Sequence, residues 1–318
     1  MTVKAAVVGC GQWGRNHVRT LAGMGALAAI SDNDPDRAAA LSAAHGIPAL
    51  PLGDILQRPD IQAVVLALPP RLHAEMGQRV LSAGKDVLIE KPIALAPADA
   101  EASVALARDG GRVLMVGHVL RFHPVFEELV RQVEAGRIGT LRHVVATRLG
   151  LGRFLGMDAV WDLAPHDLSL VIALAGTHDV DMQALRQTVL SDETDVADLR
   201  LTFGNGITAE IHVSRISPFR DRRLSAIGTE GMLTFDDLQP DGQKLAFWRH
   251  RVWREGEGFS FAQAEPEFLP TPPGLPLDAE LRHFLNCVET RQPPRTGPQE
   301  AALVVRLLDQ ASPRSGSR

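Results

Sequence analysis

The sequence predicts an α/β domain with a doubly wound parallel sheet, followed by an α+β domain with a large, mainly antiparallel open sheet. A glycine-rich turn follows an apolar strand near the start of the chain. Apolar strands and helices then alternate up to about residue 120, as in parallel sheets. Short strands separated by tight turns follow, as in antiparallel sheets. We expect the domains to span 1–120 and 121–318, with the last helices able to pack back on the first domain.

The glycine-rich turn has the spacing G-x-G-x-x-G, from Gly9 to Gly14. An apolar run ends at Gly9, and helix-compatible residues begin at Arg15. The first glycine of such a turn permits a tight bend, the second lets the backbone approach a pyrophosphate, and the third lets helix pack on strand. Glycines near the start of a domain often serve only a turn, but the flanking strand and helix here favour dinucleotide binding.

A carboxylate follows where a dinucleotide-binding fold needs one. Residues 25–30 form a second apolar strand, and Asp32 lies about 20 residues beyond the glycine turn, where it can accept hydrogen bonds from the adenosine ribose. Because the same charge repels a 2′-phosphate, Asp32 favours NAD over NADP. Asp32 or Asp34 can also cap a helix that starts at Pro35, and the two roles are compatible. Together these features predict a Rossmann domain that binds NAD.

The composition is that of an ordinary soluble protein and excludes several functions. The 318 residues are 45% hydrophobic and 22% charged, with a net charge of −5, so we expect no surface for nucleic acid or an anionic membrane. No apolar run approaches the ~20 residues that span a bilayer, and the start of the chain has no signal-peptide pattern. Two cysteines make no disulfide framework. A cytoplasmic location follows by default.

The remaining strands of the first domain place polar residues at one rim. The carboxyl ends of parallel strands meet at the same edge of a sheet, where such folds bind their ligands. Leu68-Pro69-Pro70, Glu90-Lys91-Pro92 and Gly117-His118 each follow an apolar strand and therefore share this rim with the glycine turn. The expected strands are 61–68, 85–92 and 112–117, and the expected helices are 37–45, 72–83 and 98–107.

The second domain is expected to consist of consecutive strands with no long helix between them. Gly204-Asn205-Gly206 between two alternating segments predicts a hairpin. Residues 256–276 are rich in Pro and Gly and predict a long surface loop, and 313–318 predict a frayed tail. The expected strands are 141–151, 196–203, 207–214, 224–228, 232–236 and 244–250, and the expected helices are 123–134, 278–290 and 300–311.

Lys91 is the first candidate for chemistry. It lies at a strand end, next to Glu90 and before Pro92. An ammonium group at a cofactor-binding rim can donate a hydrogen bond to a substrate hydroxyl and stabilise developing alkoxide charge. A surface salt bridge with Glu90 is the commoner fate of such a pair. The position at the rim favours the functional interpretation.

Asp162 and His166 form the second candidate. They are four residues apart and would share one face of a helix. A carboxylate beside an imidazole raises its basicity and fixes its tautomer, as a general base requires. From these residues alone, a capping aspartate and a structural histidine remain the simpler interpretation. With Asp167 they also suit a metal, but no companion cluster is present in the sequence, so no metal site is expected.

Several motifs together give the chain a resemblance to a known family. The Glu-Lys-Pro element in this context is quite specific, and the Asp-x-x-x-His pair at Asp162 and His166 completes the set. On these motifs the chain resembles, over nearly its whole length, the glucose–fructose oxidoreductase, inositol dehydrogenase and rhizopine catabolism family (Gfo/Idh/MocA). The other segments that carry the resemblance are Gly9–His17, Leu66–His73, Gly84–Pro92 and Gly117–Pro124.

The resemblance implies roles for particular residues. Lys91 would be the active-site lysine, His166 the acid/base, and Asp162 its neighbour. Arg121, Arg148 and Arg153 suit a substrate carboxylate or phosphate because of their guanidinium geometry. Solvated positions on strands and loops are an equal alternative for these three residues. Trp161 and His166 complete the expected substrate contacts. The expected cofactor contacts are Gly9, Gly11, Gln12, Trp13, Gly14, Asp32, Leu68, Pro69, His73, Glu90 and Lys91.

The resemblance also points to a substrate class. Gly-x-Trp-Gly-x-Asn and Trp-Asp-Leu-Ala-Pro-His-Asp look like the nucleotide-sugar dehydrogenases of the family, which oxidise C3 of UDP-N-acetylhexosamines or their uronic acids. The glycine-rich segment that many members carry before the Asp-x-x-x-His pair is replaced here by residues 156–161. The resemblance therefore predicts the type of reaction, whereas this difference separates the chain from those members in the region that would contact the sugar.

We therefore expect an NAD(H)-dependent oxidoreductase that acts on a secondary alcohol of a sugar or sugar nucleotide, bound between the two domains. Two alternatives remain: a keto-sugar reductase or hydride-shuttling oxidoreductase, and a non-catalytic sensor of NAD and sugar. The open face of a large antiparallel sheet needs a cover, so a homodimer or homotetramer through this face is expected.

Overall fold

The computed structural model describes residues 3–152 and 156–312, and its contacts divide the chain into two compact units. The first contains the residues up to Val119 together with Leu275–Asp309, and the second contains Leu120–Gly274 together with the residues from Gln310. The predicted tail at 313–318 and the candidate Arg153 lie outside the described residues. None of the described helices combines the length and the apolar character that a membrane crossing requires.

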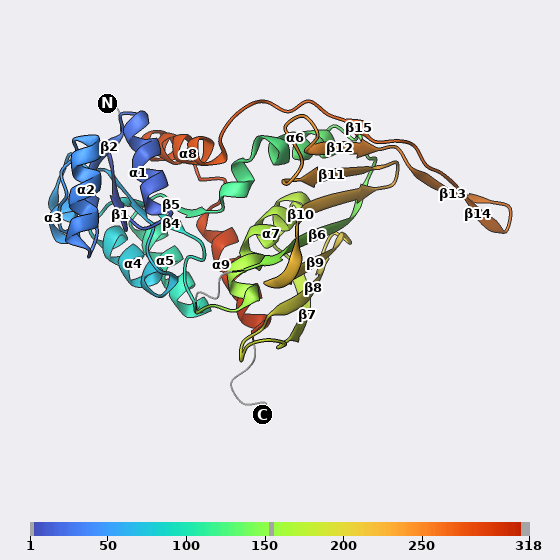
Figure 1. Ribbon diagram of the computed structural model, residues 1–318, viewed down its shortest axis with the longest axis horizontal. Helices are drawn as coiled ribbons and strands as arrows, with labels where there is room; N and C mark the ends of the chain where they lie inside the picture. Colours follow the sequence, from blue (N-terminus) through green and yellow to red (C-terminus); the bar gives the residue numbers. More distant parts are fainter. Residues whose placement is uncertain (1–2, 153–155, 313–318) are drawn as a thin grey trace. The chain divides into compact units, whose positions relative to one another are not determined.

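A five-stranded parallel sheet forms the centre of the first unit (Figure 1). Its strand order is β2-β1-β3-β4-β5, so the chain reverses its winding between β1 and β3. Nearly every residue of these strands is buried, as expected for parallel strands covered on both faces. This confirms the predicted doubly wound sheet. The strands are β1 (Ala5–Val8), β2 (Leu27–Ser31), β3 (Ala63–Leu66), β4 (Asp86–Glu90) and β5 (Leu114–Gly117).

The helices of the first unit form two packed groups. α1 contacts α2 and α8, whereas α4 contacts α5. Local sequence sets their ends: the Asp34 side chain caps α2 by accepting from the backbone N–H groups of Asp36 and Arg37, and Gly46 ends it with φ +63°. The helices are α1 (Gly14–Gly23), α2 (Pro35–His45), α3 (Leu52–Gln57), the short 3₁₀ turn η1 (Pro70–Leu72), α4 (His73–Ser82), α5 (Pro97–Asp109), α8 (Pro276–Thr290) and α9 (Pro298–Gln310).

The second unit contains an eight-stranded sheet with the order β15-β12-β11-β10-β6-β9-β8-β7 (Figure 1). The pair β6–β9 is parallel and the other pairs are antiparallel, which confirms the predicted mainly antiparallel sheet. The expected hairpin at 204–206 joins β8 to β9. The strands are β6 (Leu141–Leu151), β7 (Val180–Gln187), β8 (Val196–Phe203), β9 (Thr208–Ser214), β10 (Ile216–Gly228), β11 (Met232–Asp236), β12 (Leu245–Trp248) and β15 (Glu267–Phe268).

The two faces of this sheet differ. In β8, Leu199, Leu201 and Phe203 are buried, whereas the intervening Arg200 is exposed. α7 (Ala159–Ala175) contacts β6, β8 and β9, and α6 (Pro124–Glu134) contacts β11. We call the face that these helices cover the inner face and the opposite face the outer face.

Two predictions for the second domain are wrong. No long helix was expected among its strands, but α7 has 17 residues, and the additional strand β7 follows it. α7 is buried on most sides and carries Pro165 in its interior, so it lacks the amphipathic period that marks a helix at a surface. β7 is a mostly exposed edge strand, and the short alternation of Val180, Met182 and Ala184 with polar residues is the signal that the prediction missed.

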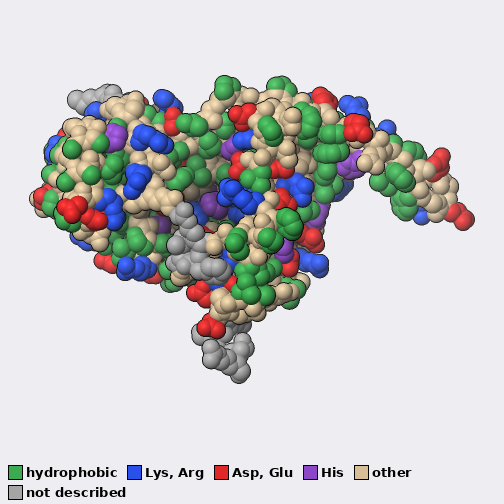
Figure 2. All heavy atoms as spheres, in the orientation of Figure 1, with side chains coloured by type: hydrophobic (Ala, Val, Ile, Leu, Met, Phe, Trp, Pro, Cys, Tyr) green, Lys and Arg blue, Asp and Glu red, His purple; other side chains and the backbone are tan. Residues whose placement is uncertain are grey.

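The predicted long loop at 256–276 is also wrong in part. It contains β14 (Gly258–Ala262), which pairs with β13 (Arg251–Glu255) in a separate two-stranded hairpin, and β15 at the sheet edge. Phe259 and Phe261 alternate with small residues, and this strand preference outweighs the flanking Gly and Pro. Figure 1 shows the hairpin projecting from the end of the sheet, and Figure 2 shows hydrophobic side chains on it.

Candidate functional site

The three glycines of the turn after β1 have different surroundings. A Cβ atom on Gly9 would lie 2.4 Å from the carbonyl oxygen of Ala67, and one on Gly14 would lie 1.8 Å from that of Gly9. Close packing among β1, β3 and α1 therefore requires both residues to be glycine. A Cβ atom on Gly11 would meet nothing within 4 Å, and no side chain caps α1. The backbone at Gly11 is thus open to a phosphate group, which fits the residues to a dinucleotide.

Asp32 connects this turn to the end of β2. Its Oδ2 atom accepts from the backbone N–H of Cys10 at 2.5 Å, and its Oδ1 atom accepts from that of Asp34 at 2.8 Å. Arg37 lies 3.4 Å from Asp32 and 2.9 Å from the capping carboxylate of Asp34. The side chain of Asp32 is only 3% exposed. The capping role therefore belongs to Asp34. Asp32 accepts from the backbone of the glycine turn, and its contact with the adenosine ribose stays a prediction.

Glu90 connects the same turn to the end of β4. Its Oε1 atom accepts a hydrogen bond from the indole N–H of Trp13 and lies 2.7 Å from Nε2 of His17. Burial opposes the charge of this carboxylate, but the bonds from His17 and Trp13 hold the pKa of Glu90 below its ordinary value. A Cβ atom on Gly117 would lie 3.1 Å from this carboxyl group, so the end of β5 also leaves room for it. Glu90 immediately precedes Lys91, which is partly exposed.

Glu280 is a second buried acid in the first unit. It lies in α8, and neither of its carboxyl oxygens has a hydrogen-bond partner among the described residues. Burial, and then the charge of Glu90, raises the pKa of Glu280 well above its ordinary value. This shift favours the neutral, protonated form of the Glu280 carboxyl group. Sequence reasoning missed it, although its spacing from Phe284 and Cys287 places it on the buried face of the helix.

His73 holds together the loops that follow β3 and β4. Its Nδ1 atom lies 2.7 Å from the carbonyl oxygen of Pro92, and its Nε2 atom lies 2.7 Å from that of Leu68. The ring is almost fully buried, and this burial lowers the pKa of His73 against the opposing effect of the two carbonyls. Pro69 is exposed, and Leu68 and Lys91 are partly exposed. His73 therefore connects the two loops that carry the rim residues Leu68 and Lys91. Gln12, in the glycine turn, is exposed.

In the second unit, α7 carries the Asp-x-x-x-His pair. Asp158 caps the helix by accepting from the backbone N–H of Trp161 at 2.9 Å, and the indole N–H of Trp161 donates to Ser312 Oγ at 2.7 Å. Asp162 and His166 are both partly exposed and lie one helical turn apart, on the same face. The helix that the general-base interpretation requires is therefore present.

Two arginines attach α7 to its surroundings. Arg148 in β6 donates from Nε and Nη2 to the two carboxylate oxygens of Asp167, at 2.7 and 2.9 Å. Arg121 donates from Nη1 to the carbonyl oxygen of Ser169 at 3.2 Å. Burial opposes the charge of Arg148, but Asp167 raises its pKa above the ordinary value. The Arg148 side chain is 11% exposed, so this pair fixes α7 on the sheet within the protein.

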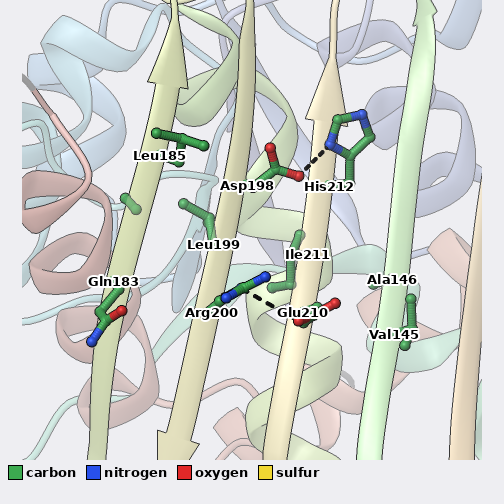
Figure 3. Close-up of a pocket in the computed structure, with 11 residues that line it drawn as sticks. Val145, Ala146, Gln183, Leu185, Asp198, Leu199, Arg200, Glu210, Ile211 and His212 are labelled. Carbon is green, nitrogen blue, oxygen red and sulfur yellow. Dashed lines mark hydrogen bonds and ion pairs between the residues drawn. The ribbon is translucent and has the colours of Figure 1, made fainter.

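A hollow of about 520 Å³ lies on the outer face of the sheet, across β7, β8, β9 and β6 (Figure 3). Asp198 and His212 pair across the strands at 2.6 Å, and Arg200 and Glu210 pair at 3.4 Å. None of the predicted site residues lines it. Among the described residues, no group of three His, Cys, Asp or Glu side chains is arranged to hold a metal.

Comparison with family models accounts for both units. A model described as an oxidoreductase family with an NAD-binding Rossmann fold, GFO/IDH/MocA, matches residues 3–118. The C-terminal domain model of the same family matches residues 126–234. The chain belongs to the GFO/IDH/MocA family. It is therefore an oxidoreductase with an NAD-binding Rossmann domain.

Similar members of the GFO/IDH/MocA family act on different substrates. The chain is 29% identical to UDP-N-acetylglucosamine 3-dehydrogenase of Acidithiobacillus ferrooxidans, with 92% of this chain and 90% of that protein covered. A solved structure of that enzyme superposes with a TM-score of 0.83 at 27% identity, covering 98% and 97% of the two chains. Inositol 2-dehydrogenase of Rhizobium meliloti is 27% identical, with 77% of this chain and 79% of that protein covered.

A further structure shares the fold. A 3-ketoreductase of Actinomadura kijaniata, solved with NADP and TDP-benzene, superposes with a TM-score of 0.80 at 22% identity, covering 100% and 98% of the two chains. Structures of this fold thus include one that holds NADP. Family membership by itself leaves the choice between NAD and NADP open.

Proposed function

We propose that this enzyme transfers a hydride between NAD and a secondary alcohol of a sugar, and that its sugar is a UDP-N-acetylhexosamine or the corresponding uronic acid, oxidised at C3. The observation that carries the proposal is the position of Glu90. It is bound to Trp13 and His17 beside the glycine turn and directly precedes Lys91. A rigid link between the cofactor turn and a candidate catalytic ammonium group is what positioned hydride transfer needs.

Lys91 and His166 would each act on the hydroxyl group of the alcohol, Lys91 on its oxygen and His166 on its proton. When bound, the nicotinamide supplies the acceptor for the hydride that leaves the carbinol carbon. His166 accepts the hydroxyl proton as that hydride leaves, and Asp162, one turn earlier on the same helix face, stabilises the imidazolium that forms. Lys91 donates a hydrogen bond to the oxygen as alkoxide charge develops on it. In the reverse direction the same groups return the proton to a carbonyl oxygen.

Asp32 and Asp34 place two carboxylates at the end of β2. Their two carboxylates lie on either side of the Arg37 guanidinium, which is 3.4 Å from the first and 2.9 Å from the second. An additional phosphate at this position would meet two negative charges and an arginine that is already paired. We therefore propose NAD as the preferred cofactor.

The test is NADH formation, followed by its absorbance, with UDP-N-acetylglucosamine, its uronic acid, myo-inositol and glucose. Lys91→Ala is compared with Lys244→Ala, because Lys244 is paired with Asp241 far along the chain from the rim. We expect the wild type to oxidise a UDP-sugar. Lys91→Ala should lower the turnover rate by about a hundredfold or more, and Lys244→Ala should leave it unchanged. Unchanged turnover in Lys91→Ala would refute the catalytic assignment, and no dinucleotide binding would refute the proposal as a whole.

We also propose that two copies associate through the outer face of the sheet. The hollow on this face carries the half-exposed ion pairs of Asp198 with His212 and Arg200 with Glu210, beside the exposed Leu185 (Figure 3). A face of this kind suits a symmetric interface in which each surface meets its own copy. Light scattering should give the mass of a dimer or tetramer, and Leu185→Glu should reduce it. A monomeric wild-type chain would refute this assignment.

A further inference from the structure

Three arginine side chains lie close together on the inner face of the sheet. Arg148 in β6 and Arg222 in β10 are direct cross-strand partners, and their neighbours Ala146 and Leu224 form a buried pair on the same face. Side chains two apart in a strand share a face, so both guanidinium groups lie on the side that α7 covers. A Cβ atom on Gly150 would lie 3.8 Å from Cγ of Arg220, so the Arg220 side chain passes over the next inward position of β6.

The three guanidinium groups are not equally satisfied. Arg148 has both carboxylate oxygens of Asp167 within 2.9 Å, and the charge of Asp162 also acts on it. Among the described residues, Arg222 has one ion-pair partner, Asp237, whose carboxylate lies 3.8 Å away and is shared with His123 at 3.7 Å. Arg220 forms no ion pair with any of the described residues, and its side chain is exposed.

Mutual repulsion among these groups is also present. Partial burial, and then the charges of Arg148 and Arg220, lower the pKa of Arg222 against the opposing effects of Asp237 and Asp167. The Arg222 side chain is nevertheless 41% exposed, so an incoming anion can reach it. The arrangement therefore leaves two guanidinium groups with donors available to a ligand, beside a third that is committed to Asp167.

We propose that Arg222 and Arg220 bind the anionic part of the substrate, whether the diphosphate of a sugar nucleotide or the carboxylate of a uronic acid. The planar fork of a guanidinium matches both anions with paired hydrogen bonds. Arg148 instead holds Asp167, and with it α7 and the adjacent His166, in place. The inference rests on the proposed function, since the same sugar must present its alcohol to His166. It excludes neutral cyclitols as the natural substrate, because they offer these arginines no charge.

The test compares Arg222→Gln with Arg223→Gln. Arg223 is the next residue of β10, lies on the outer face, is 50% exposed and is paired with Asp221, so it is a matched control. Binding of UDP and of glucuronate to the NAD-loaded enzyme is measured by calorimetry. We expect Arg222→Gln to raise the Kd of the bound anion by about tenfold or more, and Arg223→Gln to change this Kd by less than about twofold. Binding of UDP assigns the diphosphate, and binding of glucuronate alone assigns the carboxylate.

Arg220→Gln serves as a second variant. Because the Arg220 side chain is exposed, this variant should have the same unfolding temperature as the wild type. Equal binding by Arg222→Gln, Arg220→Gln and the wild type would overturn the inference, as would a wild-type enzyme that binds neither anion. Oxidation of myo-inositol without binding of either anion would overturn this inference and leave hydride transfer from a secondary alcohol to NAD intact. Binding of UDP that depends on these arginines, without any NAD-linked turnover, would support this inference and contradict the proposed hydride transfer.

Discussion

Burial and the negative charge of Glu90 together raise the pKa of the Glu280 carboxyl group and so favour its protonated form. Glu90 stays ionised because it accepts from Trp13 and lies 2.7 Å from Nε2 of His17, whereas Glu280 has no hydrogen-bond partner among the described residues. The pKa values of these two buried carboxyl groups are therefore shifted in opposite directions. This difference has measurable consequences for stability and for cofactor binding.

Glu280→Gln should stabilise the protein increasingly as pH rises. An acid whose pKa is higher in the folded chain binds more protons there, so the free energy of unfolding falls as pH rises above about 4.3, the ordinary value for glutamate. Glutamine has no proton to lose and escapes this decline, so the two proteins should differ little near pH 4. Each unit of pKa difference contributes about 1.4 kcal/mol.

The measurement is the unfolding temperature of both proteins between pH 4 and pH 9, with the exposed Glu289→Gln on the same helix as a control. Curves that stay parallel for wild type and Glu280→Gln across this range would contradict a raised pKa of Glu280. The control curve should follow the wild type throughout.

Trp13→Phe should weaken cofactor binding and also lower the stability of the protein. The phenyl ring keeps the edge contact with His17 but removes the N–H that binds Glu90. A hydrogen bond to a charged acceptor contributes about 1.5–3 kcal/mol, so we expect the Kd for NADH to rise by about tenfold. Fluorescence titration with NADH measures it, with Trp253→Phe on the projecting hairpin as the control. An unchanged Kd would show that the turn is ordered without Glu90.

Asp32→Ser should move the cofactor preference toward NADP. The change removes one of the two carboxylates that pair with Arg37 and frees its guanidinium for a 2′-phosphate. We expect the ratio of kcat/KM for NADP to that for NAD to rise by about tenfold or more. This ratio cancels any general loss from the broken contact with Cys10. Asp36→Ser, in the first turn of the same helix, should leave the ratio unchanged.

How far the sequence could predict this molecule depends on how local each signal is. The ends of β6, β8 and β11 coincide with the predicted strands, because apolar alternation and turn residues are local. The glycine turn and the candidate residues at the rim follow from the same local patterns. The extent of α7 was not predicted, because a helix buried on most sides shows no amphipathic period.

Pairings between distant residues could not be predicted in the same way. Nothing near Arg148 in the sequence indicates that Asp167 occupies its guanidinium, since the partners belong to different elements. The relation of Glu90 to Glu280 is equally non-local. Arg222 did carry a signal that was missed: it lies two residues before the buried Leu224 in an alternating strand and therefore points inward.

The buried ion pair of Arg148 and Asp167 joins β6 to α7. Arg148→Met should leave the buried Asp167 carboxylate without its cation and destabilise the protein by about 3–5 kcal/mol. Adding Asp167→Leu should restore much of this stability, because replacing both members of a buried ion pair by apolar residues is often neutral. Denaturant unfolding of both variants measures the difference, with Arg223→Met on the outer face as the control. Since Arg148 also fixes the helix that carries His166, the double variant should regain stability but remain impaired in turnover. Full recovery of both would show that α7 keeps its place without this pair.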